Sequence, residues 1–169
     1  MIWTANIAVC MAGLWLGAGI DYFTGRLPNW LTFSMMGIGI AMWATWGDPL
    51  FALKGIAVAF AIHFVLFALN VVRAGDAKLV MGAAALLGWG DALDLSAWYG
   101  LIYLPVGLMH LLAKRKLSNL AKVARYQAKK AAGEDVSDME EPELTQLRTG
   151  PVIAIAGTIA AFTDLFSLS

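Results

Sequence analysis

The sequence predicts an all-α fold: a polytopic membrane protein, built as a bundle of about six transmembrane helices with one cytoplasmic amphipathic helix or loop. Hydrophobic residues make up 60% of the 169 residues, charged residues make up 14%, and the mean hydropathy is +0.69. In soluble domains, hydrophobic residues average about half of the chain and charged residues about a quarter. The apolar residues also gather into long runs. A water-soluble fold of this size could not bury so much apolar surface, so lipid must cover most of it.

Six apolar runs approach the length of about 20 residues that a helix needs to cross a hydrocarbon core of about 30 Å. Together they form a single membrane-embedded domain over residues 1–169. The fourth run is short and carries Lys78 near its start, so it should begin among the lipid headgroups. The first has no positive stretch before it and is expected to be retained as a span. In chain order the predicted spans are Ile2–Ile20, Trp30–Trp46, Phe51–Val72, Ala77–Trp89, Leu95–Ala113 and Pro151–Phe166.

Basic residues alternate between the predicted connectors. The first connector holds Arg26 and the third holds Arg73 and Lys78, whereas the connectors 47–50 and 90–94 hold no basic residue. Because Lys and Arg favour the cytoplasmic side, this pattern predicts a multi-pass membrane protein with both termini outside. Lys54 is the one discordant charge, and its long side chain can snorkel to the surface.

The segment 114–148 reads as the soluble part of the chain, with eight of the twelve basic and six of the twelve acidic residues. A helix beginning at Lys114 would carry an apolar stripe beside its basic residues and lie along the anionic inner leaflet. The stripe is Leu117, Leu120, Val123 and Ala124. The acidic run 134–143 should be a loop. A solvated topological anchor is the favoured interpretation, with a partner-docking site as the alternative.

Two carboxylates lie at the ends of predicted spans. Asp21 follows one crossing and Asp76 follows three, so both should face the cytoplasmic leaflet at a similar depth. Charges at membrane depth are costly and point to function. Two close carboxylates share a proton, so that one can act as general base on water while the other polarises a carbonyl. The pair is therefore a candidate for peptide hydrolysis; interfacial solvation is the simpler alternative for either residue alone.

Three short motifs accompany these aspartates. Asp21 is followed by Arg26-Leu27-Pro28-Asn29, Asp76 lies in Gly75-Asp76-Ala77-Lys78-Leu79, and Gly150-Pro151 opens the last predicted span. In order and spacing they resemble the type IV prepilin peptidases. The hallmarks of these aspartyl membrane proteases are an Asp followed by Arg-Ile-Pro-Asn, a Gly-x-Gly-Asp-x-Lys-Leu and a late Gly-Pro. The chain looks like the short Tad/Cpa branch, because the connector after Asp21 has no room for the cysteine-rich methyltransferase domain of longer relatives.

The resemblance implies an intramembrane aspartyl endopeptidase that removes the leader peptide of type IV (Flp-like) prepilins at the cytoplasmic membrane face. Asp21 and Asp76 would be the catalytic pair. Substrate-binding or supporting positions would be Arg26, Pro28, Asn29, Arg73, Gly75, Lys78, Gly150 and Pro151. Partners would be the prepilin, membrane lipid and pilus-assembly proteins. Nucleic acid, cofactors and metals are not expected: Cys10 is the sole cysteine, and no His/Cys metal cluster or Gly-rich phosphate loop is present.

The local chemistry of the motif positions gives further expectations. Pro28 suits the first turn of a helix, so it should start the second span with Asn29 as a cap. Arg26 should hold the turn among the headgroups. Gly75 would let backbone approach the neighbouring carboxylate closely. Lys78 could snorkel, pair with a carboxylate or meet a lipid phosphate.

Arg73 departs from the pattern of the family, because it replaces the first Gly of Gly-x-Gly-Asp. It should place a cation near Asp76 and favour the charged carboxylate. This leaves a second hypothesis, a non-catalytic membrane component that binds prepilin or the pilus-assembly machinery. A small transporter that carries protons on the two aspartates ranks last, because the spans hold few other charges.

The remaining ionisable residues are expected to be structural. His63 lies in mid-span, where an interhelical hydrogen bond is favoured over a proton relay, and His110 is interpreted in the same way. Solvated positions in outer connectors or at an outer helix end are expected for Asp48, Asp91, Asp94 and Asp164.

Overall fold

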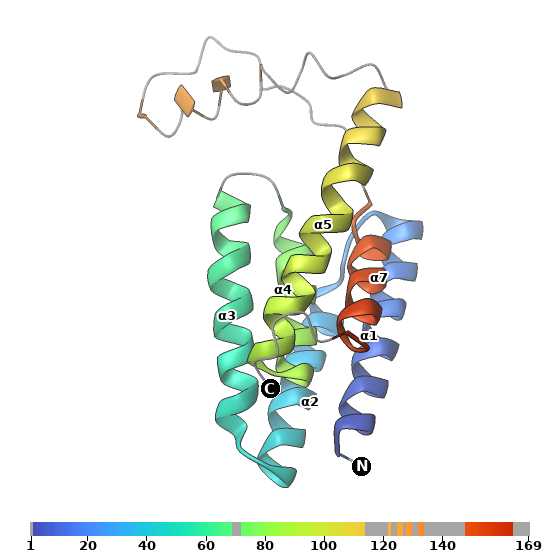
Figure 1. Cartoon of the computed structure of the whole chain (residues 1–169), viewed down its shortest axis with the longest axis vertical. Coiled ribbons are helices and arrows are strands. Elements are labelled where there is room, and N and C mark those ends of the chain that lie inside the picture. Colours follow the sequence, from blue (N-terminus) through green and yellow to red (C-terminus); the bar gives the residue numbers. More distant parts are fainter. Residues whose placement is uncertain are drawn as a thin grey trace. The chain divides into compact units, whose positions relative to one another are not determined.

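The computed structural model describes residues 2–68, 72–113 and 148–163, with scattered positions between 122 and 133. Within these residues the chain forms six α-helices and no strand (Figure 1). Two compact units are present: residues 1–103 with 148–169, and residues 104–147. The helices are α1 (Ile2–Thr24), α2 (Asn29–Trp46), α3 (Pro49–Ala68), α4 (Ala74–Leu87), α5 (Trp89–Ala113) and α7 (Gly150–Ala160).

The short helix α4 is the centre of the first unit. It packs against α1, α2, α3 and α7, and its residues from Leu79 to Leu87 are buried, apart from the partly exposed Met81. Small side chains let the neighbours come close: a Cβ atom added to Gly39 of α2 would lie 2.6 Å from the backbone carbonyl of Ala85. Gly55 of α3 meets the backbone of Ala84 in the same way. Close packing of small residues is how helices associate where lipid already solvates large apolar side chains.

Many large apolar side chains point outward. Exposed examples are Trp15, Leu16, Phe60, Phe64 and Leu101. A soluble protein rarely exposes so much contiguous apolar surface. In the described part of the chain, three helices contain stretches long and apolar enough to cross a membrane: Ala5–Thr24, Pro49–Ala68 and Trp89–Met109. Helix α7 is apolar but has only 11 residues. The all-helical membrane class is thus confirmed, while six complete crossings stay a prediction.

Specific turn chemistry sets the helix ends. Helix α1 ends at Gly25, whose φ of 69° is left-handed and whose N–H donates to the Asp21 carbonyl at 2.8 Å. Pro28 is extended and immediately precedes α2. The predicted cap at Asn29 is wrong, because α2 already begins there and no side chain caps it. Asp48 caps α3, since its carboxylate accepts the Leu50 N–H at 2.9 Å.

Helix α5 begins earlier than the sequence predicts. Gly88, with a φ of 98°, makes a turn so tight that any side chain there would strike Phe51. Helix α5 therefore starts at Trp89 instead of Leu95. The expectation that Asp94 is solvated is wrong as a result, because Asp94 lies inside the helix and is buried. Asp48 is exposed, as expected.

Several predictions fall outside the described residues. The segment 114–147, with its amphipathic helix and acidic loop, is described only at scattered positions. Asp164 and the side chain of His110 also lie outside the described part. These predictions stay as stated.

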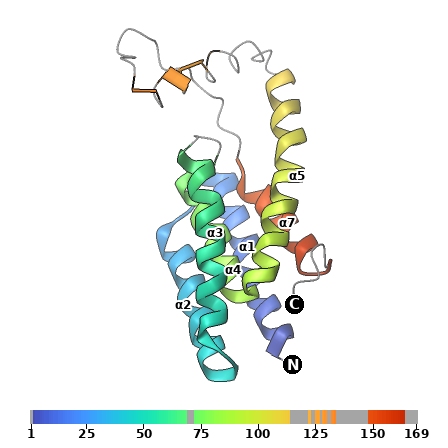
Figure 2. The ribbon, with the colours of Figure 1, turned by 60° about the vertical axis from the view of Figure 1, so that its left-hand side comes forward.

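The ends of the helices place the important polar residues. Figures 1 and 2 show the C-terminal end of α1 and the N-terminal ends of α4 and α7 at the same end of the first unit. The connection from α2 to α3 and that from α4 to α5 lie at the opposite end. One end of the bundle thus gathers three helix termini.

The contact between α2 and α4 gives a test of this packing. We expect Gly39→Ala to lower the free energy of unfolding by about 1–3 kcal/mol, because the added methyl group would strike the α4 backbone. Gly37→Ala in the same helix is the matched control, since a Cβ there meets nothing within 4 Å. Thermal unfolding in detergent, followed by circular dichroism, measures both. Equal midpoints for the two variants would contradict the close α2–α4 packing.

A candidate carboxylate site at three helix ends

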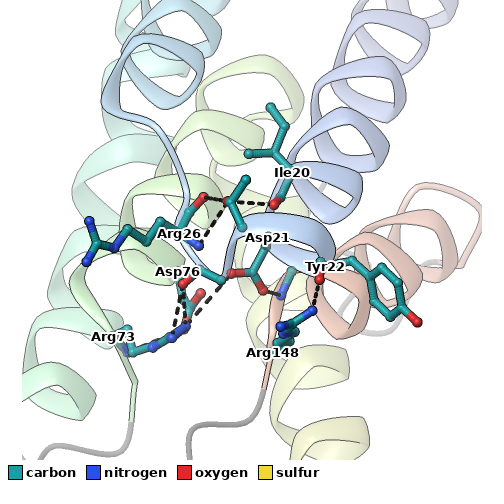
Figure 3. A network of polar contacts seen from close by, with 10 residues as sticks. Ile20, Asp21, Tyr22, Arg26, Arg73, Asp76 and Arg148 are labelled. Carbon is teal, nitrogen blue, oxygen red and sulfur yellow. Dashed lines mark hydrogen bonds and ion pairs between the residues drawn. The ribbon is translucent and has the colours of Figure 1, made fainter.

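Two buried carboxylates lie where three helix ends meet. Asp21 is in the last turns of α1, Asp76 is in the first turn of α4, and α7 begins at Gly150. Both aspartates are only 1% exposed. Figure 3 shows their side chains in one polar network with Arg73 between them. The structure therefore brings Asp21 and Asp76 together, as expected from their similar predicted depth in the membrane.

Helix α7 holds the Asp21 carboxylate. The N–H of Gly150 donates to Asp21 Oδ2 at 2.9 Å, so Asp21 satisfies one of the unpaired N–H groups at the start of α7. Gly150 has no room for a side chain: a Cβ there would lie 2.7 Å from the Cβ of Asp21. This explains a glycine at this position. Pro151, which follows, needs no hydrogen-bond acceptor in the first turn.

The other carboxylate, Asp76, closes the start of its own helix. Its Oδ2 accepts the backbone N–H of Arg73 at 3.4 Å, in the manner of the acidic residue of a capping box. The buried Thr149 hydroxyl lies near this carboxylate without a hydrogen bond from the described residues. Residues that precede α4 and α7 thus lie beside Asp76.

Arg73 joins the two aspartates. Its Nη1 lies 3.8 Å from Asp21 Oδ1, and both Nη atoms donate to the Gly25 carbonyl at 3.3–3.4 Å. Its backbone N–H also donates to Asp76 Oδ2, so Arg73 contacts both aspartates. The guanidinium additionally neutralises the C-terminal end of α1, where unpaired carbonyls gather.

The two aspartate motifs contact each other beside the carboxylates. Lys78 donates from Nζ to Asn29 Oδ1 at 3.0 Å and lies 5.5 Å from the centroid of the Phe33 ring. A Cβ at Gly75 would meet the Cβ of Leu27 at 3.3 Å. The glycine thus lets α4 start close against the turn between α1 and α2. The hydrogen bond between Lys78 and Asn29 thus joins α4 to α2.

Two supporting positions stand apart from this network. Arg26 has an exposed side chain, and its backbone N–H bonds to the Thr24 hydroxyl at 3.3 Å. Pro28 is half-buried and shapes the turn before α2. Neither is shown in contact with a carboxylate.

Sequence patterns do not point to three further residues near the site. Arg148 donates to the carbonyl of Tyr22 and lies over the Tyr22 ring. In the sequence, only its position two residues before Gly150 suggests that it lies near the site. Tyr99 of α5 is buried and interacts electrostatically with both aspartates and with Arg73. Tyr103 interacts with Asp76. No motif marks either tyrosine.

His63 differs from its prediction. Its Nδ1 lies 3.0 Å from the Ala59 carbonyl of its own helix, and its ring stacks on Tyr99 at 5.9 Å between centroids. Among the described residues Nε2 has no hydrogen-bond partner. The predicted interhelical hydrogen bond is therefore wrong, and ring stacking joins the helices instead.

Two carboxylates in one buried network can divide an acid and a base role between them, because two close negative charges are not formed cheaply. Such a pair can activate a water molecule and polarise a carbonyl. Among the residues that the structure describes, no group of three or more His, Cys, Asp or Glu side chains could hold a metal ion.

Comparison with known proteins gives one result. A family model described as the type IV leader peptidase family matches residues 8–110, more than half of the chain. No curated protein and no solved structure matches the chain. The matched part contains Asp21, Arg73 and Asp76, whereas Gly150 lies beyond it.

The ion pair between Arg73 and Asp21 can be tested by a double-mutant cycle with Arg73→Gln and Asp21→Asn. We expect a coupling energy of about 1 kcal/mol, because one partner is buried while Arg73 is 35% exposed and partly screened. The coupling energy is obtained from the unfolding free energies of the four variants in mixed detergent. The exposed Arg26, in the same cycle with Asp21, is the control and should show coupling near zero. Equal coupling energies for Arg73 and Arg26 would contradict the ion pair between Arg73 and Asp21.

Proposed function

Because the chain belongs to the type IV leader peptidase family, we propose that it is an intramembrane aspartyl endopeptidase that cleaves the leader from small, Flp-like type IV prepilins. The single observation that carries this proposal is the joint burial of Asp21 and Asp76 in one network at one end of the bundle. Membership of a peptidase family supports the assignment of the chain as a protease. The paired carboxylates account for the aspartyl chemistry.

In the proposed reaction one carboxylate is ionised and the other is protonated. The ionised one takes a proton from a water molecule as the water oxygen bonds to the peptide carbonyl carbon. The protonated one donates a hydrogen bond to the carbonyl oxygen. When the C–N bond breaks, the amide nitrogen takes the proton that the first carboxylate received from water, and it leaves as the new amino terminus of the pilin. The leader departs with a free carboxyl group.

The proposed substrate fits the location of the site. Asp21 lies at the end of a helix that is apolar enough to span a membrane, and the start of α4, with Asp76, lies at the same end of the bundle. A peptide bond at a lipid surface would therefore reach both carboxylates. Prepilins are expected to present such a bond between a basic leader and a hydrophobic helix. By the distribution of basic residues this end faces the cytoplasm, and the site would work in the bacterial inner membrane without a cofactor.

Substitution of each aspartate tests the proposal. Co-expression with a small prepilin should give complete processing by the wild-type chain. Asp21→Asn and Asp76→Asn should each lower processing at least a hundredfold, because removal of either acid–base partner disables the pair. The gel shift of the shortened pilin measures cleavage. Asp48→Asn, at the helix start of α3, is the control and should process normally. Full processing by either site variant would remove the mechanism.

A second function is favoured by one observation. The Arg73 guanidinium lies against Asp21 and the Gly25 carbonyl, where the family carries glycine. A cation fixed there could keep the pair from acting on a substrate. The chain would then be a non-catalytic membrane component that binds prepilin or the pilus-assembly machinery.

Arg73→Gly separates the two functions. In a working peptidase this change should lower processing about tenfold, because Asp21 loses its charged partner and α4 loses a tie to the end of α1. The same prepilin gel shift reports the result. A wild-type chain without activity that gains it through Arg73→Gly would instead support the non-catalytic component.

A further inference from the structure

The hydroxyl of Tyr99 is a buried polar group without a role in the chemistry above. Tyr99 is 2% exposed, and among the described residues its hydroxyl has no hydrogen-bond partner. Buried hydroxyl groups are nearly always paired, because leaving one unpaired costs free energy. An unpaired one in a native fold therefore calls for an explanation.

Helix geometry places Tyr99 at the level of the carboxylates. Helix α4 runs from Asp76 at the site to Leu87 at the far end, and α5 returns from the tight turn at Gly88. At a rise of about 1.5 Å per residue, both Asp76 and Tyr99 lie roughly 17 Å from that turn. The side chain of Tyr99 accordingly interacts electrostatically with Asp76, Arg73 and Asp21. It belongs to the same polar region of the bundle.

Two rings hold Tyr99 in place. His63 stacks on it at 5.9 Å between centroids with an interplanar angle of 25°, and Tyr103 lies 5.4 Å away on its own helix. The His63 ring is itself fixed by the contact of Nδ1 with the Ala59 carbonyl. A ring packed in this way cannot turn its hydroxyl toward solvent. The donor is therefore preorganised within the site.

The site also contains an unsatisfied acceptor. Asp21 Oδ1 is buried and accepts no hydrogen bond from the described residues, although Arg73 lies 3.8 Å away. An unpaired donor and an unpaired acceptor in one buried region indicate that a further polar group is accommodated there. A peptide bond brings a carbonyl oxygen as acceptor, and the attacking water brings donors.

We propose that Tyr99 is an additional catalytic residue of the leader peptidase, whose hydroxyl donates a hydrogen bond to the carbonyl oxygen of the peptide bond being cut. The inference rests on the proposed function. The hydroxyl keeps its proton throughout and stabilises the negative charge that grows on the carbonyl oxygen as water adds. It supplements the hydrogen bond from the protonated aspartate.

Tyr99→Phe tests the inference, because it removes one oxygen atom and keeps the stacked ring. With purified protein in detergent and a small prepilin as substrate, kcat should fall about a hundredfold while KM changes less than threefold, since the bond forms mainly in the transition state. The midpoint of thermal unfolding should stay the same or rise, because the variant no longer buries an unpaired hydroxyl. Thr45→Val, which removes an exposed hydroxyl group at the opposite end of the bundle, should change neither value.

The outcomes separate the inference from the proposed function. An unchanged kcat in Tyr99→Phe, beside inactive Asp21→Asn and Asp76→Asn variants, overturns the role of Tyr99 and leaves the peptidase intact. A lower kcat that comes with a lower unfolding midpoint shows a structural role and also overturns it. A wild-type chain that leaves the prepilin uncut overturns the proposed function and the role of Tyr99 together.

Discussion

A carboxylate within a membrane bundle persists only if neighbouring groups compensate its burial, and the arrangement around Asp21 follows from that constraint. The backbone N–H at the start of α7 bonds to one of its oxygens, and the Arg73 guanidinium lies near the other. These groups come from parts of the chain that are 50 to 130 residues apart. The same contacts join α1, α4 and α7, so the polar site also serves as a structural link at this end of the bundle.

The apolar part of the bundle makes these contacts possible. Helix α4 is surrounded through glycine and alanine contacts with α2 and α3, which bring backbones together without large side chains. Its first turn, with Asp76, is thereby fixed against the end of α1. The outside of the bundle carries many large apolar residues, which is unusual for a soluble protein and suits a lipid environment.

Much of this architecture could be predicted from the sequence, because lipid imposes long apolar runs that are visible without an alignment. The meeting of Asp21 and Asp76 could also be predicted, since both follow an odd number of crossings. The exact helix ends could not. They depend on local turns, such as the left-handed Gly25 and Gly88, and the turn at Gly88 buries Asp94 inside α5. Tyr99 and Thr149 were missed because only packing between distant helices brings them near the carboxylates.

The contact between Gly150 and Asp21 has a consequence for biosynthesis. Asp21 and Asp76 are both made early, yet the N–H that holds Asp21 belongs to a helix that leaves the ribosome after nearly 130 further residues have been added. During membrane insertion the half-assembled bundle therefore has both acidic groups but not the backbone donor that fixes one of them. Completion of the polar centre is thus delayed until α7 has been made and has docked against the end of α1.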